Sequence, residues 1–115
     1  MQVQLQPRQL PVSAILQQRK DELLKFLPDW NDATQSHIFA ENFFGDQSVE
    51  LRRKATQDLF SKAGEIQRIG EMKPLNNLRG AFVIEGSRGN IEVSFTLSPE
   101  NPPLIQEFKA KELSR

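Results

Sequence analysis

The chain has no cysteine and no tyrosine, and it has one histidine and one tryptophan. Without cysteine the protein forms no disulfide, no thiolate nucleophile and no zinc site that uses sulfur ligands. A lone histidine, His37, excludes a metal site built from several histidines. We therefore expect no metal and no cofactor, whereas the absence of cysteine does not by itself assign a cellular compartment.

The chain also has no excess of charge. It contains 15 Lys and Arg residues and 15 Asp and Glu residues, so its formal net charge is zero. Nucleic-acid-binding proteins usually carry a basic surplus, and we therefore expect no nucleic-acid partner. The sequence also lacks three catalytic motifs: a glycine-rich phosphate loop followed by lysine, Ser-x-x-Lys and Gly-x-Ser-x-Gly. No catalytic residue is assigned from a motif.

Long apolar runs are absent as well. The first residues, MQVQLQPRQLPV, contain no stretch that could serve as a signal peptide or membrane segment, so a soluble chain without a membrane partner is expected. Residues 1–10 are rich in glutamine and are interpreted as a loose lead-in. With 115 residues, of which eight are Phe, the remainder suits one domain over residues 11–115.

Apolar residues at helical spacing predict three helices in the first half of the chain, over residues 11–28, 29–45 and 48–64. We expect Asp29 and Ser48 to be N-caps of the second and third helices. Gly45 and Gly64 are expected to end them. The second helix would have one face made of Trp30, Ala33, His37, Ala40 and Phe44.

After Gly64 the spacing changes to that of strands. Four strands are predicted, over residues 65–73, 79–86, 91–98 and 104–113. The third alternates strictly, with an apolar face made of Ile91, Val93, Phe95 and Leu97. Helices followed by a meander predict an α+β fold, with three N-terminal helices packed on a curved four-stranded antiparallel sheet. Such a sheet would form a cone with a pocket at its open end.

Five residues are candidates for ligand binding: Trp30, His37, Glu41, Phe44 and Arg79. On a helix His37 and Glu41 would share one face, which suits an acid–base pair or, more simply, the edge of a packed face. Trp30 would stack on a ligand or fix the helix in the core. Phe43 and Phe44 would line a pocket or fill it.

Arg79 stands at the start of a predicted strand, before Gly80. Its guanidinium would contact a ligand carboxylate, or it would be an ordinary surface arginine beside a glycine that permits close backbone approach. The polar face of the alternating strand, which includes Ser94 and Thr96, has short side chains. This face would allow a second copy of the chain to approach, so a homodimer is a candidate assembly.

Several turn and core positions together resemble a known domain type. They are Trp30, Phe39-Ala40-x-Asn42, the turn at Asp46, Gly64, Leu78-Arg79-Gly80, Leu97-x-Pro99-Glu100 and Pro103-x-Ile105-Gln106. Over roughly residues 27–108 the chain resembles the small accessory domain beside the catalytic domain of bacterial serine hydrolases of the β-lactamase-like and related types. The resemblance implies a bacterial source and a hydrolase partner domain.

Such accessory domains resemble the cone fold of nuclear transport factor two, ketosteroid isomerase and cystatin-like proteins. In the isomerase a buried Asp acts as base and a Tyr stabilises the oxyanion. Because this chain has no Tyr, that activity is not implied. The favoured hypothesis is a non-catalytic accessory or binding domain that associates with a hydrolase domain, with itself, or with a small apolar or peptide-like ligand. The alternative is a small isomerase or hydratase with His37 or a carboxylate as base.

Overall fold

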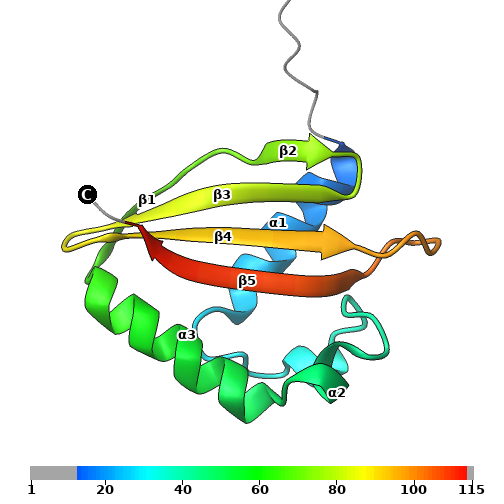
Figure 1. The fold of residues 1–115 in the computed structure, drawn as a ribbon, viewed down its shortest axis with the longest axis horizontal. Coiled ribbons are helices and arrows are strands. Elements are labelled where there is room, and N and C mark those ends of the chain that lie inside the picture. Colours follow the sequence, from blue (N-terminus) through cyan, green and yellow to red (C-terminus); the bar gives the residue numbers. More distant parts are fainter. Residues whose placement is uncertain (1–12, 114–115) are drawn as a thin grey trace, which may run out of the picture.

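The protein has an α+β fold, seen in a computed structural model that describes residues 13–113 (Figure 1). The expected lead-in at residues 1–10 lies outside the described residues, as do the two ends of the domain predicted over residues 11–115. Within residues 13–113 three α-helices and a short 3-10 helix precede a five-stranded antiparallel sheet. The elements are α1 (Ala14–Phe26), η1 (Ala33–Gln35), α2 (Phe43–Asp46), α3 (Val49–Ala63), β1 (Ile66–Ile69), β2 (Lys73–Asn76), β3 (Arg79–Gly86), β4 (Asn90–Leu97) and β5 (Ile105–Leu113).

Helices α1 and α3 begin at serine caps. The Oγ of Ser13 accepts a hydrogen bond from the backbone N–H of Leu16 over 3.3 Å, and the Oγ of Ser48 accepts one from the backbone N–H of Leu51 over 3.3 Å. Each cap satisfies a backbone donor that the first turn of a helix leaves free. Gly64 ends α3 with a φ of 83°, in the region that favours glycine. The third predicted helix and both of its ends are thus confirmed.

The second predicted helix is wrong. Trp30, Asp32 and His37 have φ angles of 58°, 62° and 64°, which a right-handed helix does not allow. The segment contains only η1 and the four-residue α2, Gly45 lies inside α2, and Asp29 caps no helix. The spacing of apolar residues suggested a helical face, but these residues reach the core from a chain that turns repeatedly.

Five strands form the sheet rather than the predicted four, because the predicted strand at residues 65–73 ends early as β1 and a further strand, β2, begins at Lys73 and continues beyond the prediction to Asn76. Both pair with β3, and the strand order in the sheet is β1-β3-β4-β5, with β2 beside β1 along β3. Between them the Gly70 N–H donates to the Val83 carbonyl of β3 over 2.7 Å, and the side chain of Met72 is buried. A Cβ on Gly80 would lie 2.5 Å from the Met72 Sδ, so Met72 occupies space that only glycine leaves free.

Strands β3 and β4 have one buried and one partly exposed face, as their alternation predicts. The buried side chains are Phe82, Ile84, Ile91, Val93, Phe95 and Leu97. Figure 1 shows α1 crossing behind the sheet and α2 and α3 along its β5 side. No helix of residues 13–113 covers the side of the sheet that faces the viewer. None of the helices in this range is both long and apolar enough to cross a bilayer.

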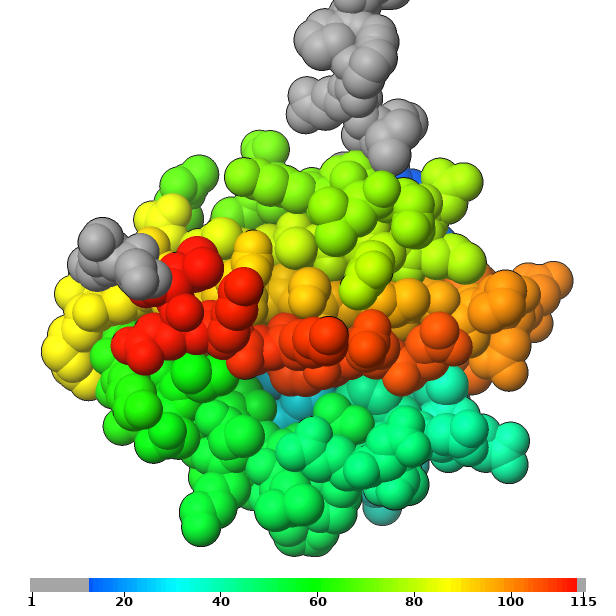
Figure 2. Space-filling model, in the orientation of Figure 1, coloured from blue at the N-terminus to red at the C-terminus, as the bar shows by residue number. Residues whose placement is uncertain are grey.

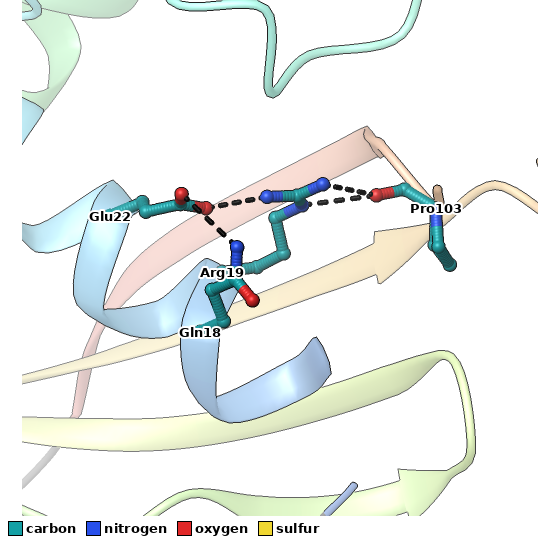
Figure 3. Close-up of polar contacts among 4 residues, drawn as sticks. All are labelled: Gln18, Arg19, Glu22 and Pro103. Carbon is teal, nitrogen blue, oxygen red and sulfur yellow. Dashed lines mark hydrogen bonds and ion pairs between the residues drawn. The ribbon is translucent and has the colours of Figure 1, made fainter. Parts of the chain in front are cut away.

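Two buried cations fix α1 to two separate segments, the connection from β4 to β5 and the segment between β1 and β2. The Nε and Nη2 of Arg19 donate to the carbonyl oxygen of Pro103 over 3.0 and 2.8 Å, and Nη1 pairs with Glu22 over 2.6 Å (Figure 3). The Nζ of Lys20 donates to the carbonyl oxygen of Gly70 over 2.7 Å. Arg19 and Lys20 are 4% and 7% exposed. The hydrogen bonds therefore compensate for the water that their charged groups lose on burial.

Candidate functional site

Three of the five sequence candidates line one small hollow on the surface. His37, Glu41 and Phe44 border a volume of about 210 Å³, together with Ala33, Thr34, Phe39 and Ala40. His37 and Glu41 are exposed, whereas Phe44 is half-buried. The two polar side chains border the same hollow from an irregular segment in which His37 has a φ of 64°, and not from one helix face. The hollow is open to solvent and can hold a small group against the rings.

Trp30 lies beneath this hollow, in the core. Its side chain is 1% exposed, and the centre of its ring is 6.3 Å from that of Phe44 and 5.1 Å from that of Phe108. The indole Nε1 donates to the Oγ1 of Thr56 in α3 over 3.0 Å. The ring therefore contacts protein side chains on all sides, and the indole N–H already has its acceptor.

Arg79 lies away from the other four candidates, on the face of the sheet opposite the helices. It pairs with Thr96 of β4 in the strand register, and its Nη2 lies 3.8 Å from Glu107 of β5. Both side chains of this ion pair are 47% exposed. The structure thus brings His37, Glu41, Phe44 and Trp30 together and leaves Arg79 on another surface.

The space beneath the sheet is filled by aromatic rings. Phe43, Phe82 and Phe95 are each 1% exposed, and the centres of Phe39 and Phe43 are 4.6 Å apart in a stacked arrangement. Packing at this density fills the space beneath the centre of the sheet, and a hollow of only about 90 Å³ remains between α3 and β5. Among the described residues, His37 and Glu41 therefore converge at an open hollow and not in a closed cavity.

A larger groove adjoins the hollow, and Ala40 and Glu41 border both. It has a volume of about 610 Å³ and lies between the segment around α2 and the connection from β4 to β5. Figure 2 shows these two segments, in cyan-green and orange, on the right of the molecule. Its acidic lining residues are Glu41, Asp46, Glu100 and Glu107, and no lysine or arginine lines it.

Sequence analysis did not predict this groove, since its acidic residues come from segments about 60 positions apart and share no motif. Only the pairing of residues 38–40 with Ile105 brings the segments together: Ala40 N–H donates to the Ile105 carbonyl, and Ile105 N–H donates to the Ile38 carbonyl, each over 2.7 Å. Within residues 13–113 no group of three His, Asp or Glu side chains has a geometry that could hold a metal ion.

Arg52 supports the acidic side of the groove from below. Its Nη2 donates to the Phe43 carbonyl over 2.9 Å, its Nε donates to the Gln47 carbonyl over 3.1 Å, and its guanidinium lies 3.7 Å from the centre of the Phe43 ring. Burial lowers the pKa of Arg52, and the negative charge of Asp46 opposes this shift. Arg52 fixes α2 in place by contacts that nothing in the sequence had indicated.

Comparisons of the chain with protein-family models, with curated proteins and with solved structures found no match.

Proposed function

We propose that this chain is a non-catalytic accessory or binding domain that acts through its surface. One observation carries the proposal: the interior is filled by Trp30, Phe43, Phe82 and Phe95, each 1% exposed. Within residues 13–113 the remaining space between the helices and the sheet, about 90 Å³ between α3 and β5, is lined by no His, Asp, Glu or Lys that could act as a base. Recognition then takes place on exterior surfaces, where polar side chains set the orientation of a partner.

The proposal includes the cone-shaped fold of nuclear transport factor two, ketosteroid isomerase and cystatin-like proteins. Two features support it: the helices precede the strands in the chain, and they lie on one side of the sheet (Figure 1). A serine hydrolase domain is the candidate partner, on the basis of the sequence resemblance over roughly residues 27–108. A second copy of the chain and a small apolar or peptide-like ligand are the other candidates.

A retention experiment tests the hydrolase partner. The immobilised chain is incubated with a bacterial lysate, and retained proteins are labelled with an active-site fluorophosphonate probe and identified by mass spectrometry. We expect a serine hydrolase to be retained and labelled. A matched column carries a Ser94→Arg variant, which places a long charged side chain in the middle of the helix-free sheet face. Equal recovery of the hydrolase on both columns would show that the hydrolase binds to another surface of the chain.

One observation favours the alternative, a small isomerase or hydratase. His37 and Glu41 line the same hollow, where a base and an acid could act on a small molecule. The direct test is exchange of α-hydrogens of small ketones for deuterium, compared between the native chain and a His37→Asn variant. We expect the two to give the same background rate. Exchange that depends on His37 would replace the binding proposal with the enzymatic one.

A further inference from the structure

We propose that the helix-free face of the sheet binds a second copy of this chain, with the twofold axis running along β4. This inference rests on the proposed function, because it names the partner of a surface-acting binding domain. The face is formed by the side chains of β3, β4 and β5 that point away from the helices, and Figure 2 shows it open to the viewer. We call it the outer face.

The strand register defines three cross-strand rows on the outer face. They are Arg79–Thr96–Glu107, Ala81–Ser94–Lys109 and Val83–Glu92–Lys111. The central positions of the first two rows carry short side chains, Thr96 and Ser94, and Ala81 and Val83 beside them are small as well. Two sheets that pack face to face lie about 10 Å apart, and short side chains in the middle of the face permit this approach.

Charges on the two flanking strands are complementary. At one end of the face β3 carries Arg79 and β5 carries Glu107; toward the other end β3 carries Glu85 and β5 carries Lys111. A twofold axis along β4 preserves position along the strands and exchanges β3 with β5. It therefore places Arg79 opposite Glu107 of the second copy, and Glu85 near Lys111 of the second copy. Both contacts occur twice in the dimer.

The remaining charges are compatible with this arrangement. Glu92 approaches its own symmetry mate, but its carboxylate lies 3.5 Å from the Nζ of Lys111 in the same chain. Lys109 faces Ala81, where its aliphatic stem covers the short side chain and its ammonium reaches solvent. Arg68, on the edge strand β1, lies 3.0 Å from Glu85 in the same chain, so it belongs to the rim of this contact. On the outer face of β3, β4 and β5, three basic side chains balance three acidic ones.

Charge reversal provides a test with an internal rescue. Arg79→Glu alone places two glutamates opposite each other at both contacts, and Glu107→Arg alone places two arginines there. An equimolar mixture of the two variants forms a heterodimer in which both contacts again join a glutamate and an arginine. Since both residues are 47% exposed, each variant is expected to fold, which circular dichroism verifies.

The readout is molar mass by sedimentation over a range of concentrations. We expect the native chain to dimerise, each variant to dimerise about a hundredfold more weakly, and the mixture to recover most of the native affinity. Dimerisation of the native chain should also weaken as salt concentration rises. The matched control is Lys54→Glu, an equal reversal of charge at an exposed position of α3 away from the outer face, which should leave the dimer intact.

Three outcomes would overturn the inference: a native chain that stays monomeric at its highest soluble concentration, single variants that dimerise like the native chain, or a mixture that stays monomeric. A monomeric native chain that still retains a serine hydrolase from a lysate would overturn the dimer alone and leave the binding function standing. Exchange catalysed through His37 would instead overturn the binding function on which the dimer rests.

Discussion

The indole N–H of Trp30 and the hydroxyl oxygen of Thr56 form a buried hydrogen bond of 3.0 Å. It joins the irregular segment after α1 to the middle of α3, across 26 positions of sequence. Thr56 in turn donates to the carbonyl oxygen of Arg52 over 2.7 Å. A single threonine hydroxyl thus serves as acceptor for the only tryptophan and as donor to the helix that supports the acidic groove.

Replacing Thr56 by Val should destabilise the protein by about 1 to 3 kcal/mol. The substitution keeps the shape of the side chain but leaves the indole N–H buried without an acceptor. Urea unfolding gives the free energy of unfolding directly. The matched control is Thr34→Val at an exposed position, which should change stability by less than about 0.5 kcal/mol. Equal effects of the two substitutions would contradict the role assigned to Thr56.

Removal of the Arg19 side chain should be costly, at roughly 2 to 4 kcal/mol in an Arg19→Ala variant. Its two hydrogen bonds to Pro103 come from a charged donor that is 4% exposed, and such bonds contribute more than neutral ones. Thermal or urea unfolding measures the loss.

The control for Arg19 is Arg68→Ala. Arg68 also forms an ion pair, with Glu85 over 3.0 Å, but its side chain is 65% exposed. An exposed pair contributes at most about 1 kcal/mol because water and salt screen it. If Arg68→Ala proved as destabilising as Arg19→Ala, burial would not explain the importance of Arg19.

Gly86 and Gly45 should respond in opposite ways to alanine. A Cβ on Gly86 would collide with the carbonyl oxygen of Ala63 and lie 2.9 Å from that of Gly89, so Gly86→Ala should cost about 1 to 3 kcal/mol. A Cβ on Gly45 meets nothing within 4 Å, and Gly45 lies in α2. Gly45→Ala should therefore be neutral or stabilising by up to about 1 kcal/mol. Destabilisation by Gly45→Ala would show that the α2 segment has a different conformation.

Trp30 gives a direct optical test of the filled interior. Its ring is 1% exposed and contacts four phenylalanine rings, so its fluorescence should be blue-shifted and protected from acrylamide in the folded protein. Denaturant should remove both properties in a single step. As the only tryptophan, it reports on this site alone. Free quenching by acrylamide in the native protein would contradict a packed interior.

Local chemistry made several elements predictable. The serine at position 48 and the glycine at position 64 mark the ends of α3, since a cap and a residue of positive φ act within a few positions of sequence. The strict alternation of β4 identified its buried face, because a strand exposes only one side of its pleat here. The order of helices and strands, and hence the α+β class, followed from these patterns.

The segment from Trp30 to Phe44 was not predictable in this way. Its apolar residues have helical spacing, yet three of its residues adopt left-handed φ angles. The irregular chain brings the rings of Trp30, Phe39 and Phe43 into one cluster. The candidate site was likewise only partly predictable. His37 and Glu41 line the same hollow, but they do so from an irregular segment rather than from one helix face.

What the sequence alone determined is the set of features governed by near neighbours: the Ser48 cap and the Gly64 end of α3, and the strand alternation of β4. Tertiary structure decided which distant residues meet. It ended β1 at Ile69, ahead of the buried Met72 that packs against Gly80, it joined residues 38–40 to Ile105, and it gathered Glu41 and Glu107 along one groove. Such contacts depend on how side chains fill a shared interior, and that is a property of the whole chain.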